Sequence, residues 1–359
     1  MIHIDILLPF GLPPPELARD VLRDLKVPAL ATLLARSNCK RQTFDEFARA
    51  LPHEAWLASQ AGLPASAPSD SEHQSSPPIA VAAMRALGLS VDQGIWFMLH
   101  PAHIHVARDH LVLTDLRQVN LTDADARQLF DVAIPLFEEA GRSLVYGNAN
   151  TWFMRADDWH DLRTSTPDAT CGHNIDIWMP QGEGERAWRK LQNEVQMAWF
   201  THPLNQQREA RGLQSVNSLW LWGGSAAAPL PSTGQATYRE VFSPAGMSSG
   251  WLAAFGQFAA TAVADCRAGD IVSAAPQHGL LILDQLIQPA LTAEWSSWLQ
   301  QLRTLESDWF APLLQALQSG KLDRLSLVFT DNTRITASTA SRLSLKKFWV
   351  KPALTGLLS

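Results

Sequence analysis

Residues 171–224 read CGHNIDIWMPQGEGERAWRKLQNEVQMAWFTHPLNQQREARGLQSVNSLWLWGG, and this stretch holds turn, helix and strand signals in close succession. The run from Pro180 to Gly184 is typical of a turn that leads into a helix, and we expect Glu185 to Phe200 to be that helix. The sequence His202-Pro203-Leu204-Asn205 follows, with Arg208 one helical turn further on. Ser218 to Gly224 predicts a buried strand that ends at two glycines.

Before this stretch, the chain predicts helices and strands separated by a polar linker at Pro64 to Pro78, which is rich in Ser and Pro. We expect strands at Ile2–Pro9, Gly94–His100, Ile104–Arg108, Leu111–Leu116, Leu144–Tyr146 and Thr151–Met154. We expect helices at Glu16–Leu25, Pro28–Ser37, Thr43–Gln60 (interrupted at Pro52) and Ile79–Leu87, and one more with Thr122 as its N-cap.

After Gly224 the predicted elements alternate between strand and helix. They are Glu240–Phe242, Trp251–Cys266, Gly279–Asp284, Ala293–Gln318 and Arg324–Thr330. Alternation of this kind indicates an α/β fold with a mostly parallel sheet that helices cover on both faces.

Composition excludes several classes of protein. The 359 residues are 46% hydrophobic and 18% charged, which indicates a globular chain long enough for two domains. A net charge of −6 gives no basic surface for nucleic acid. Cys39, Cys171 and Cys266 lie far apart, and neither a leader nor an apolar run of about 20 residues is present. We therefore expect a soluble cytoplasmic protein that binds neither nucleic acid nor membrane.

Residues 77–224 resemble the cofactor-independent phosphoglycerate mutases, most closely the archaeal-type branch. That family carries Pro-His-Asp, Pro-x-Gly-Glu-Gly, His-Pro-x-Asn-x-x-Arg and a strand ending in Gly-x-Gly. In the same order, this chain has Gly-His-Asn at 172–174, the second and third motifs unchanged, and a strand ending in Gly223-Gly224. The resemblance implies an alkaline-phosphatase-like core formed by residues 1–76 and 225–359, and an inserted α+β domain at 77–224. It is weaker outside residues 77–224.

The resemblance also implies a site with two divalent ions, whose ligands this chain has largely lost. The family's first ligand, an Asp before Gly, is replaced by Phe10, and its Asp-His pair after the last strand reads Asp331-Asn332. No histidine follows His278. The family's Ser or Thr nucleophile has no hydroxyl counterpart near His53, which we expect to be partly exposed rather than a phosphoacceptor. We therefore expect no cofactor, or manganese or another divalent metal if the protein is active.

Two further sets of residues are candidate sites. The first set could bind an anion or hold the fold together, and it comprises His173, His202, Asn205, Arg208 and Arg211. The second set is a run of histidines in which alternate residues share a strand face, and it either binds a metal or is merely solvated: His100, His103, His105 and His110.

Tryptophan is unusually frequent, with 14 residues against 2 tyrosines. Helical spacing predicts that Trp295, Trp298 and Trp309 lie on one apolar helix face. Trp220 and Trp222 alternate on a strand beside two glycines, and they are the better candidates for contact with a ligand or partner.

Together these features favour a mutase-like protein that has lost its metals and acts as a regulatory or ligand-sensing protein. It is similar to the degenerate bacterial group of RpfE-type regulatory proteins, with an unidentified small anion or protein as partner. Two alternatives remain open at this point. One is an active mutase or phosphatase with a rearranged site built from Asp331 and the histidines of the inserted domain, and the other is a metal-binding protein that uses the histidine run.

Overall fold

The computed structural model describes residues 1–23, 25–63, 74–228, 237–245, 252–347 and 349–357. The first ten residues of the predicted linker at 64–78 lie outside this part. The chain forms two compact units: unit 1 is Met1–Glu46, Pro52–Gly62 and Pro231–Ser359, and unit 2 is Phe47–Leu51 and Leu63–Leu230. The sequence predicts domain boundaries between residues 76 and 77 and between residues 224 and 225. The segments at 47–51 and 74–76 group with unit 2 because Arg49 donates to Ser165 Oγ at 2.9 Å and Ser76 Oγ lies 2.7 Å from Thr164 Oγ1.

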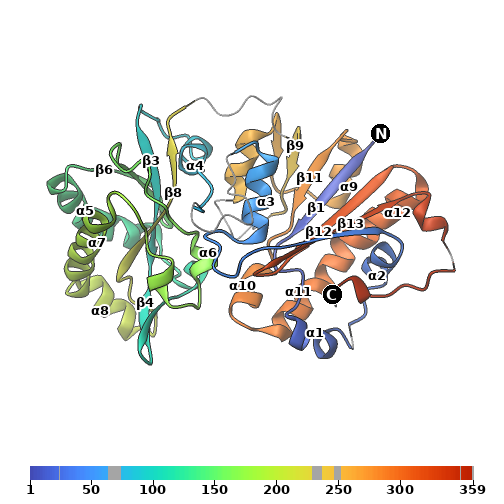
Figure 1. Ribbon diagram of the computed structural model, residues 1–359, viewed down its shortest axis with the longest axis horizontal. Coiled ribbons are helices and arrows are strands. Elements are labelled where there is room, and N and C mark those ends of the chain that lie inside the picture. The colour runs from blue at the N-terminus through green and yellow to red at the C-terminus, as the bar shows by residue number, and fades with distance from the viewer. Residues whose placement is uncertain (24, 64–73, 229–236, 246–251, 348, 358–359) are drawn as a thin grey trace. The chain divides into compact units, whose positions relative to one another are not determined.

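Unit 1 contains a seven-stranded, mostly parallel sheet (Figure 1). Five strands are parallel and the last two in the spatial order are antiparallel to their neighbours. The order across the sheet is β10 (Thr261–Val263), β9 (Glu240–Phe242), β11 (Gly279–Ile282), β1 (His3–Leu8), β12 (Arg324–Thr330), β13 (Arg334–Ser341) and β2 (Asn38–Thr43). This architecture confirms the predicted α/β class.

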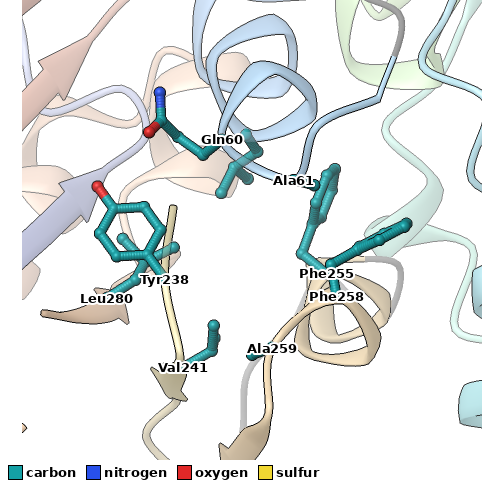
Figure 2. A pocket seen from close by; sticks show the side chains of 9 residues that line it. Gln60, Ala61, Tyr238, Val241, Phe255, Phe258, Ala259 and Leu280 are labelled. Atoms are coloured by element: carbon teal, nitrogen blue, oxygen red, sulfur yellow. The ribbon is translucent and has the colours of Figure 1, made fainter. Parts of the chain in front are cut away.

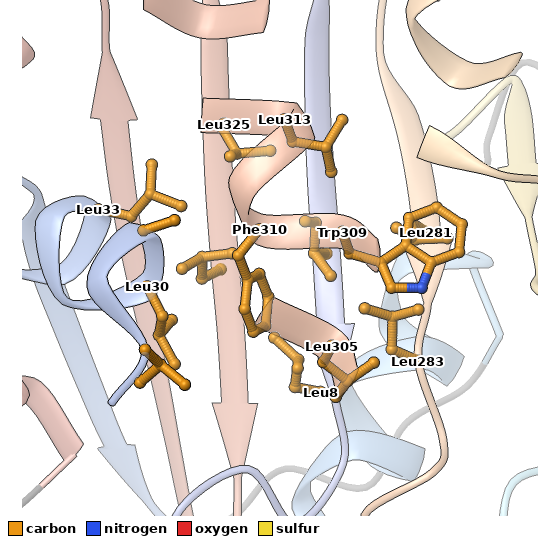
Figure 3. Packing of buried hydrophobic residues seen from close by; sticks show 14 of the residues in the cluster. Leu8, Leu30, Leu33, Leu281, Leu283, Leu305, Trp309, Phe310, Leu313 and Leu325 are labelled. Carbon is orange, nitrogen blue, oxygen red and sulfur yellow. The ribbon is translucent and has the colours of Figure 1, made fainter. Parts of the chain in front are cut away.

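Helices α2 (Pro28–Ala35), α11 (Trp295–Leu305) and α12 (Ala311–Ser319) pack on one face of this sheet (Figure 3). Ile4, Ile6 and Leu8 of β1 belong to this core, together with Trp298 and Phe310. A π-helical turn, Glu306–Phe310, joins α11 to α12, so most of the predicted helix at 293–318 is confirmed. Because side chains alternate along a strand, His3, Asp5 and Leu7 lie on the opposite face.

The other helices of unit 1 are α1 (Pro15–Leu22), α3 (Pro52–Gln60), α9 (Ala268–Ala274) and α10 (Ile287–Leu291), with short 3-10 turns at Leu252–Phe258, Ser344–Lys346 and Thr355–Leu357. Two predictions were wrong here. Residues 44–51 are not helical, because the helix begins at Pro52. The segment 252–266 forms a 3-10 turn and the short strand β10 instead of one helix.

Unit 2 is built on a four-stranded antiparallel sheet in the order β6 (Ser143–Asn148), β7 (Thr151–Arg155), β3 (Ile95–Ala102) and β8 (Ser218–Ala226). A separate hairpin pairs β4 (Ile104–Ala107) with β5 (His110–Leu113). Its helices are α4 (Ala80–Ala86), α5 (Asp123–Glu139), α6 (Pro167–Thr170), α7 (Glu185–Phe200) and α8 (Pro203–Ala210), with 3-10 turns at Leu116–Gln118 and Ile175–Ile177.

The predicted elements of this unit are largely confirmed. Helix α7 has the predicted bounds, and Thr122 caps α5 by accepting a hydrogen bond from the Asp125 amide at 3.1 Å. Trp220 and Trp222 are fully buried, and Trp220 Nε1 donates to the Ser165 carbonyl at 2.9 Å. The interpretation of these two tryptophans as contacts for a ligand or partner was therefore wrong. Among the described residues, no helix combines the length and the apolar character needed to span a membrane.

Candidate functional site

The carboxyl ends of β1, β11 and β12 meet at one edge of the unit 1 sheet, which is where open α/β sheets usually carry their sites. Phe10 follows β1, Asp284 follows β11 and Asp331 follows β12. This edge is therefore the place to test the expected two-metal site.

Phe10 occupies a tight turn with a left-handed backbone (φ 55°) and is 4% exposed. Its amide donates to Thr330 Oγ1 at 3.3 Å, and its carbonyl accepts a hydrogen bond from Trp298 Nε1 at 2.9 Å. A β-carbon at Gly11 would come within 2.6 Å of the Phe329 ring, so the next residue has no room for a side chain. The turn thus presents an apolar ring, which cannot ligate a metal, at the end of the central strand.

Asp331 is held in the turn between β12 and β13. Its Oδ1 accepts hydrogen bonds from the amides of Thr333 at 2.9 Å and Arg334 at 2.7 Å. Its Oδ2 lies 2.5–2.6 Å from the guanidinium of Arg334. These contacts neutralise the carboxylate and fix it as the cap of the turn, so Asp331 does not present a carboxylate to an ion.

Three buried polar side chains remain near this edge: His53, Glu54 and Asp284, each at most 1% exposed. The ring of His53 lies 5.9 Å from that of Phe10, in an edge contact. The prediction that His53 is partly exposed was therefore wrong, because α3 buries its first turn. One imidazole and two carboxylates are fewer donors than two ions require when each needs at least four ligands. The described residues of this edge therefore do not fit a two-metal centre.

The His-Pro-x-Asn-x-x-Arg motif opens α8 in unit 2. His202 is the N-cap of α8, and its Nδ1 accepts a hydrogen bond from the Leu204 amide at 3.2 Å. Asn205 is buried, donates to the carbonyls of Trp199 and Val216 at 2.9 Å each, and accepts a hydrogen bond from the Val216 amide at 2.8 Å. Both side chains thus bind the local backbone.

Arg208 is 0% exposed, and Nε donates to the Gln214 carbonyl at 2.8 Å. Its Nη2 donates to the Val119 carbonyl, and its Nη1 lies 3.9 Å from Asp125 Oδ2. Burial lowers the pKa of this guanidinium.

The other two residues of this set are exposed. Arg211 lies at the C-cap of α8, and His173 stacks on Trp178 with ring centroids 5.1 Å apart. The contacts of His202, Asn205 and Arg208 favour the structural alternative, and anion binding by the five residues stays a prediction.

The four histidines of the run have separate environments. His100 is buried and its Nδ1 lies 2.6 Å from the Asn150 carbonyl, while His110 pairs with its neighbour Asp109 at 3.0 Å. Burial lowers the pKa of His100 to about 4. The rings of His103 and His105 stack 5.9 Å apart. Within the described residues, no group of three potential ligand atoms within 4.8 Å of one another includes any of these four, and their binding of a metal stays a prediction.

A buried ion cluster in unit 2 escaped the sequence reasoning. Arg117 Nη2 donates to Asp168 Oδ1 at 2.8 Å, and Nε lies 3.0 Å from Asp115 Oδ1. Burial raises the pKa of Asp115, and the two carboxylates raise the pKa of Arg117 against the effect of its own burial. In the sequence, only the spacing Asp115-x-Arg117 indicates this cluster, because Asp168 belongs to α6 and lies about 50 residues away along the chain. This cluster joins the 3-10 turn at Leu116–Gln118 to α6 by placing one guanidinium between two carboxylates.

A second polar cluster that sequence reasoning missed lies in unit 1. His3, Asp5 and His278 each offer one potential metal-ligand atom, and these three atoms lie within 4.8 Å of one another. The signal for it was the pattern His-Ile-Asp-Ile in a strand that is otherwise apolar.

Comparisons with known proteins agree with the α/β architecture. No family model matches the chain. A probable 2,3-bisphosphoglycerate-independent phosphoglycerate mutase from Geobacter sulfurreducens is 22% identical over 156 residues, which cover 42% of this chain and 38% of that protein. The match thus spans well under half of the relative's length.

Two solved structures are similar over most of the chain. The PH0037 protein from Pyrococcus horikoshii matches with a TM-score of 0.53 and 12% identity, over 95% of this chain and 87% of that one. The cofactor-independent phosphoglycerate mutase from Thermoplasma acidophilum has a TM-score of 0.48 and 14% identity, over 100% of this chain and 94% of that one. The sequence match to the Geobacter mutase points to a phosphoglycerate-mutase-like fold. The fold match to the Pyrococcus protein agrees with a mixed α/β architecture that has a mostly parallel central sheet.

Proposed function

We propose that this protein is a phosphoglycerate-mutase-like protein that does not carry out two-metal phosphoryl transfer, and that it serves as a regulatory or ligand-sensing protein in the cytoplasm. It would belong with the degenerate RpfE-type proteins, and its ligand would be a small anion or a protein partner. The observation that carries the proposal is the buried Phe10 ring at the carboxyl end of β1.

The chemistry supports this proposal. Metal-assisted phosphoryl transfer needs charged or imidazole ligands that hold the ions and offset the charge on the phosphoryl group. At the edge of the unit 1 sheet, Phe10 contributes a phenyl ring, and the charge of Asp331 is already compensated by Arg334. These two features oppose a two-metal mechanism even though the fold is mutase-like.

A second candidate function is a mutase or phosphatase with a rearranged metal site. The observation in its favour is that His53, Glu54 and Asp284 are buried near the same edge, where a shielded carboxylate has a stronger interaction with a cation. The sequence suggests Asp331 as a ligand of such a site, but Arg334 already compensates its charge, and in this alternative Asp284 takes that role.

The test is a coupled assay for the interconversion of 3- and 2-phosphoglycerate with manganese, cobalt, magnesium and zinc supplied in turn. Titration calorimetry with 3-phosphoglycerate under the same conditions measures binding separately from turnover. We expect no turnover above background with any metal. Binding without turnover would indicate a ligand sensor, and neither binding nor turnover would leave a protein partner as the ligand class.

The matched variants are Asp284→Asn and, as a control, Asp308→Asn on the exposed side of the π-helical turn. Turnover that is abolished by Asp284→Asn and kept by Asp308→Asn would establish the rearranged enzyme and overturn the proposal. Asp331→Ala is a poor control, because it removes the cap of the β12–β13 turn and would lower activity through misfolding.

A further inference from the structure

Strand β1 reads His3-Ile-Asp5-Ile-Leu-Leu8, which is unusual for the centre of a parallel sheet. Such strands are normally apolar on both faces because helices or loops cover both. Asp5 is only 9% exposed and pairs in register with Leu280 of β11 and Ser326 of β12. A buried carboxylate is costly unless charged or polar groups compensate it. The residues around Asp5 therefore need a physical explanation.

Two imidazoles converge on this carboxylate from neighbouring strands. His3 Nε2 lies 2.8 Å from Asp5 Oδ1, and His278 Nε2 lies 3.1 Å from Asp5 Oδ2. His3 and Asp5 share a face of β1, and the register Ile4↔Gly279 places His278 beside His3 at the start of β11. The two imidazole rings stack at 4.5 Å with an interplanar angle of 11°. The sheet register therefore sets this arrangement, and no flexible loop is involved on the His3 and Asp5 side.

The neighbouring groups orient the carboxylate without filling its coordination sphere. Tyr238 donates its hydroxyl to Asp5 Oδ2 at 2.5 Å, and Ser326 Oγ lies 3.0 Å from His3 Nε2. Asp5 Oδ1 is buried and accepts no hydrogen bond of good geometry from the described residues, although His3 Nε2 is close. Second-sphere contacts of this kind position metal-binding carboxylates and histidines in known sites.

A serine–histidine–aspartate relay does not explain the cluster. Such a relay needs the carboxylate on one ring nitrogen and the serine on the other. Here both Asp5 and Ser326 lie against the same atom, Nε2 of His3. Instead, one potential ligand atom of each of the three residues lies within 4.8 Å of the others.

We propose that His3, Asp5 and His278 bind a divalent transition-metal ion such as zinc on the face of the unit 1 sheet opposite α2, α11 and α12. Two imidazoles and a carboxylate are a ligand set that zinc and similar ions use, with the remaining position open to water. Metal–ligand bonds of about 2.0–2.1 Å at tetrahedral angles place ligand atoms about 3.4 Å apart. The observed 2.8 and 3.1 Å contacts would need to widen by about 0.3–0.6 Å on binding.

A separate small pocket lies next to Tyr238. The small pocket that Tyr238 lines, together with Gln60, Phe255 and Phe258, has a volume of about 20 Å³ (Figure 2). This space holds about one water molecule. The hydroxyl of Tyr238 points away from the centre of the pocket in the same view. The three candidate ligands do not line this pocket, and His278, whose side chain is 35% exposed, is the most accessible of them.

The experiment is metal binding by the untagged full chain after removal of metals with a chelator. Zinc affinity is measured by competition with a chromophoric chelator, and cobalt(II) is added in parallel because its visible absorption reports ligand number and geometry. We expect one equivalent of each ion per chain, and an affinity that falls on acidification because protons compete for the imidazoles. Failure of the wild-type protein to bind either ion would overturn the proposal.

Two single variants, a control and one double variant locate the ion. His278→Gln, which changes the most exposed of the three side chains, should raise the zinc dissociation constant more than about tenfold and alter the cobalt spectrum. Asp5→Asn should do the same, and near-ultraviolet circular dichroism checks that each variant is folded. The matched control is His160→Gln, at an exposed histidine of unit 2. It should leave the zinc dissociation constant and the cobalt spectrum unchanged. If binding persists in His278→Gln and Asp5→Asn but is lost in the double variant His103→Gln/His105→Gln, the site lies in unit 2 and the proposal is wrong.

Discussion

Replacing Asn205 with Ala distinguishes a structural motif from an anion site in the segment that most resembles the mutases. The side chain satisfies the amide and the carbonyl of Val216 at 2.8 and 2.9 Å, and it also donates to the carbonyl of Trp199. Trp199 keeps a second partner, the His202 amide at 3.1 Å, so two backbone groups would be left unsatisfied. A buried group without its partner costs about 1–3 kcal/mol. We therefore expect Asn205→Ala to lower the free energy of unfolding of unit 2 by roughly 2–6 kcal/mol.

The measurement is urea unfolding followed by tryptophan fluorescence, since Trp152, Trp188 and Trp199 are buried in unit 2. Gln206→Ala, at the next and exposed position of α8, is the control and should change stability by less than about 0.5 kcal/mol. A loss below about 1 kcal/mol for Asn205→Ala, accompanied by weaker binding of 3-phosphoglycerate, would refute the structural interpretation.

Three further changes test other parts of the structure. Burial lowers the pKa of His100 from 6.5 to about 4, so the unfolded chain takes up a proton at a higher pH than the folded protein does. The free energy of unfolding should therefore fall by on the order of 3 kcal/mol between pH 6.5 and about pH 4. His100→Gln should flatten this part of the pH–stability curve, and an unchanged slope would contradict the assignment of this pH dependence to His100. His202→Ala should cost about 1 kcal/mol through loss of the α8 N-cap while His202→Ser costs little, as measured by urea unfolding. Phe310→Ala should destabilise unit 1 by about 3–5 kcal/mol, because the ring is fully buried among α2, α11 and the sheet. Calorimetry should show a lower unfolding temperature for unit 1, and a shift in the unit 2 transition alone would contradict this prediction.

Strong local signals allowed much of the fold to be predicted. Helix α7 was predicted with correct bounds because a glycine turn precedes it and its apolar residues repeat at helical spacing. Trp298 and Trp309 lie in the core as their spacing indicated. Four of the five parallel strands, β1, β9, β11 and β12, were found because they are short apolar runs between turns, whereas β10 was predicted as part of a helix.

Elements whose stability comes from tertiary contacts were missed. β2 reads Asn-Cys-Lys-Arg-Gln-Thr and is exposed throughout, so no apolar pattern marks it, and it exists because it pairs with β13 at the sheet edge. The burial of His53 and the meeting of His3 with His278 also depend on chain segments far apart in the sequence. Spacing along the chain cannot report such contacts.

The turn at Phe10 explains how a mutase-like fold can persist without the expected metal ligands. A left-handed conformation costs a residue with a β-carbon about 1–2 kcal/mol, so the surroundings must impose it. They do so mainly through the backbone: the Leu12 amide donates to the Thr330 carbonyl at 3.0 Å, the Gly11 amide donates to the Leu8 carbonyl at 3.1 Å, and Trp298 donates to the Phe10 carbonyl. None of these contacts uses the side chain of residue 10. The turn can therefore be kept for the sake of the fold while its side chain changes from a ligand to an apolar ring, and the presence of the fold alone is no evidence for the chemistry.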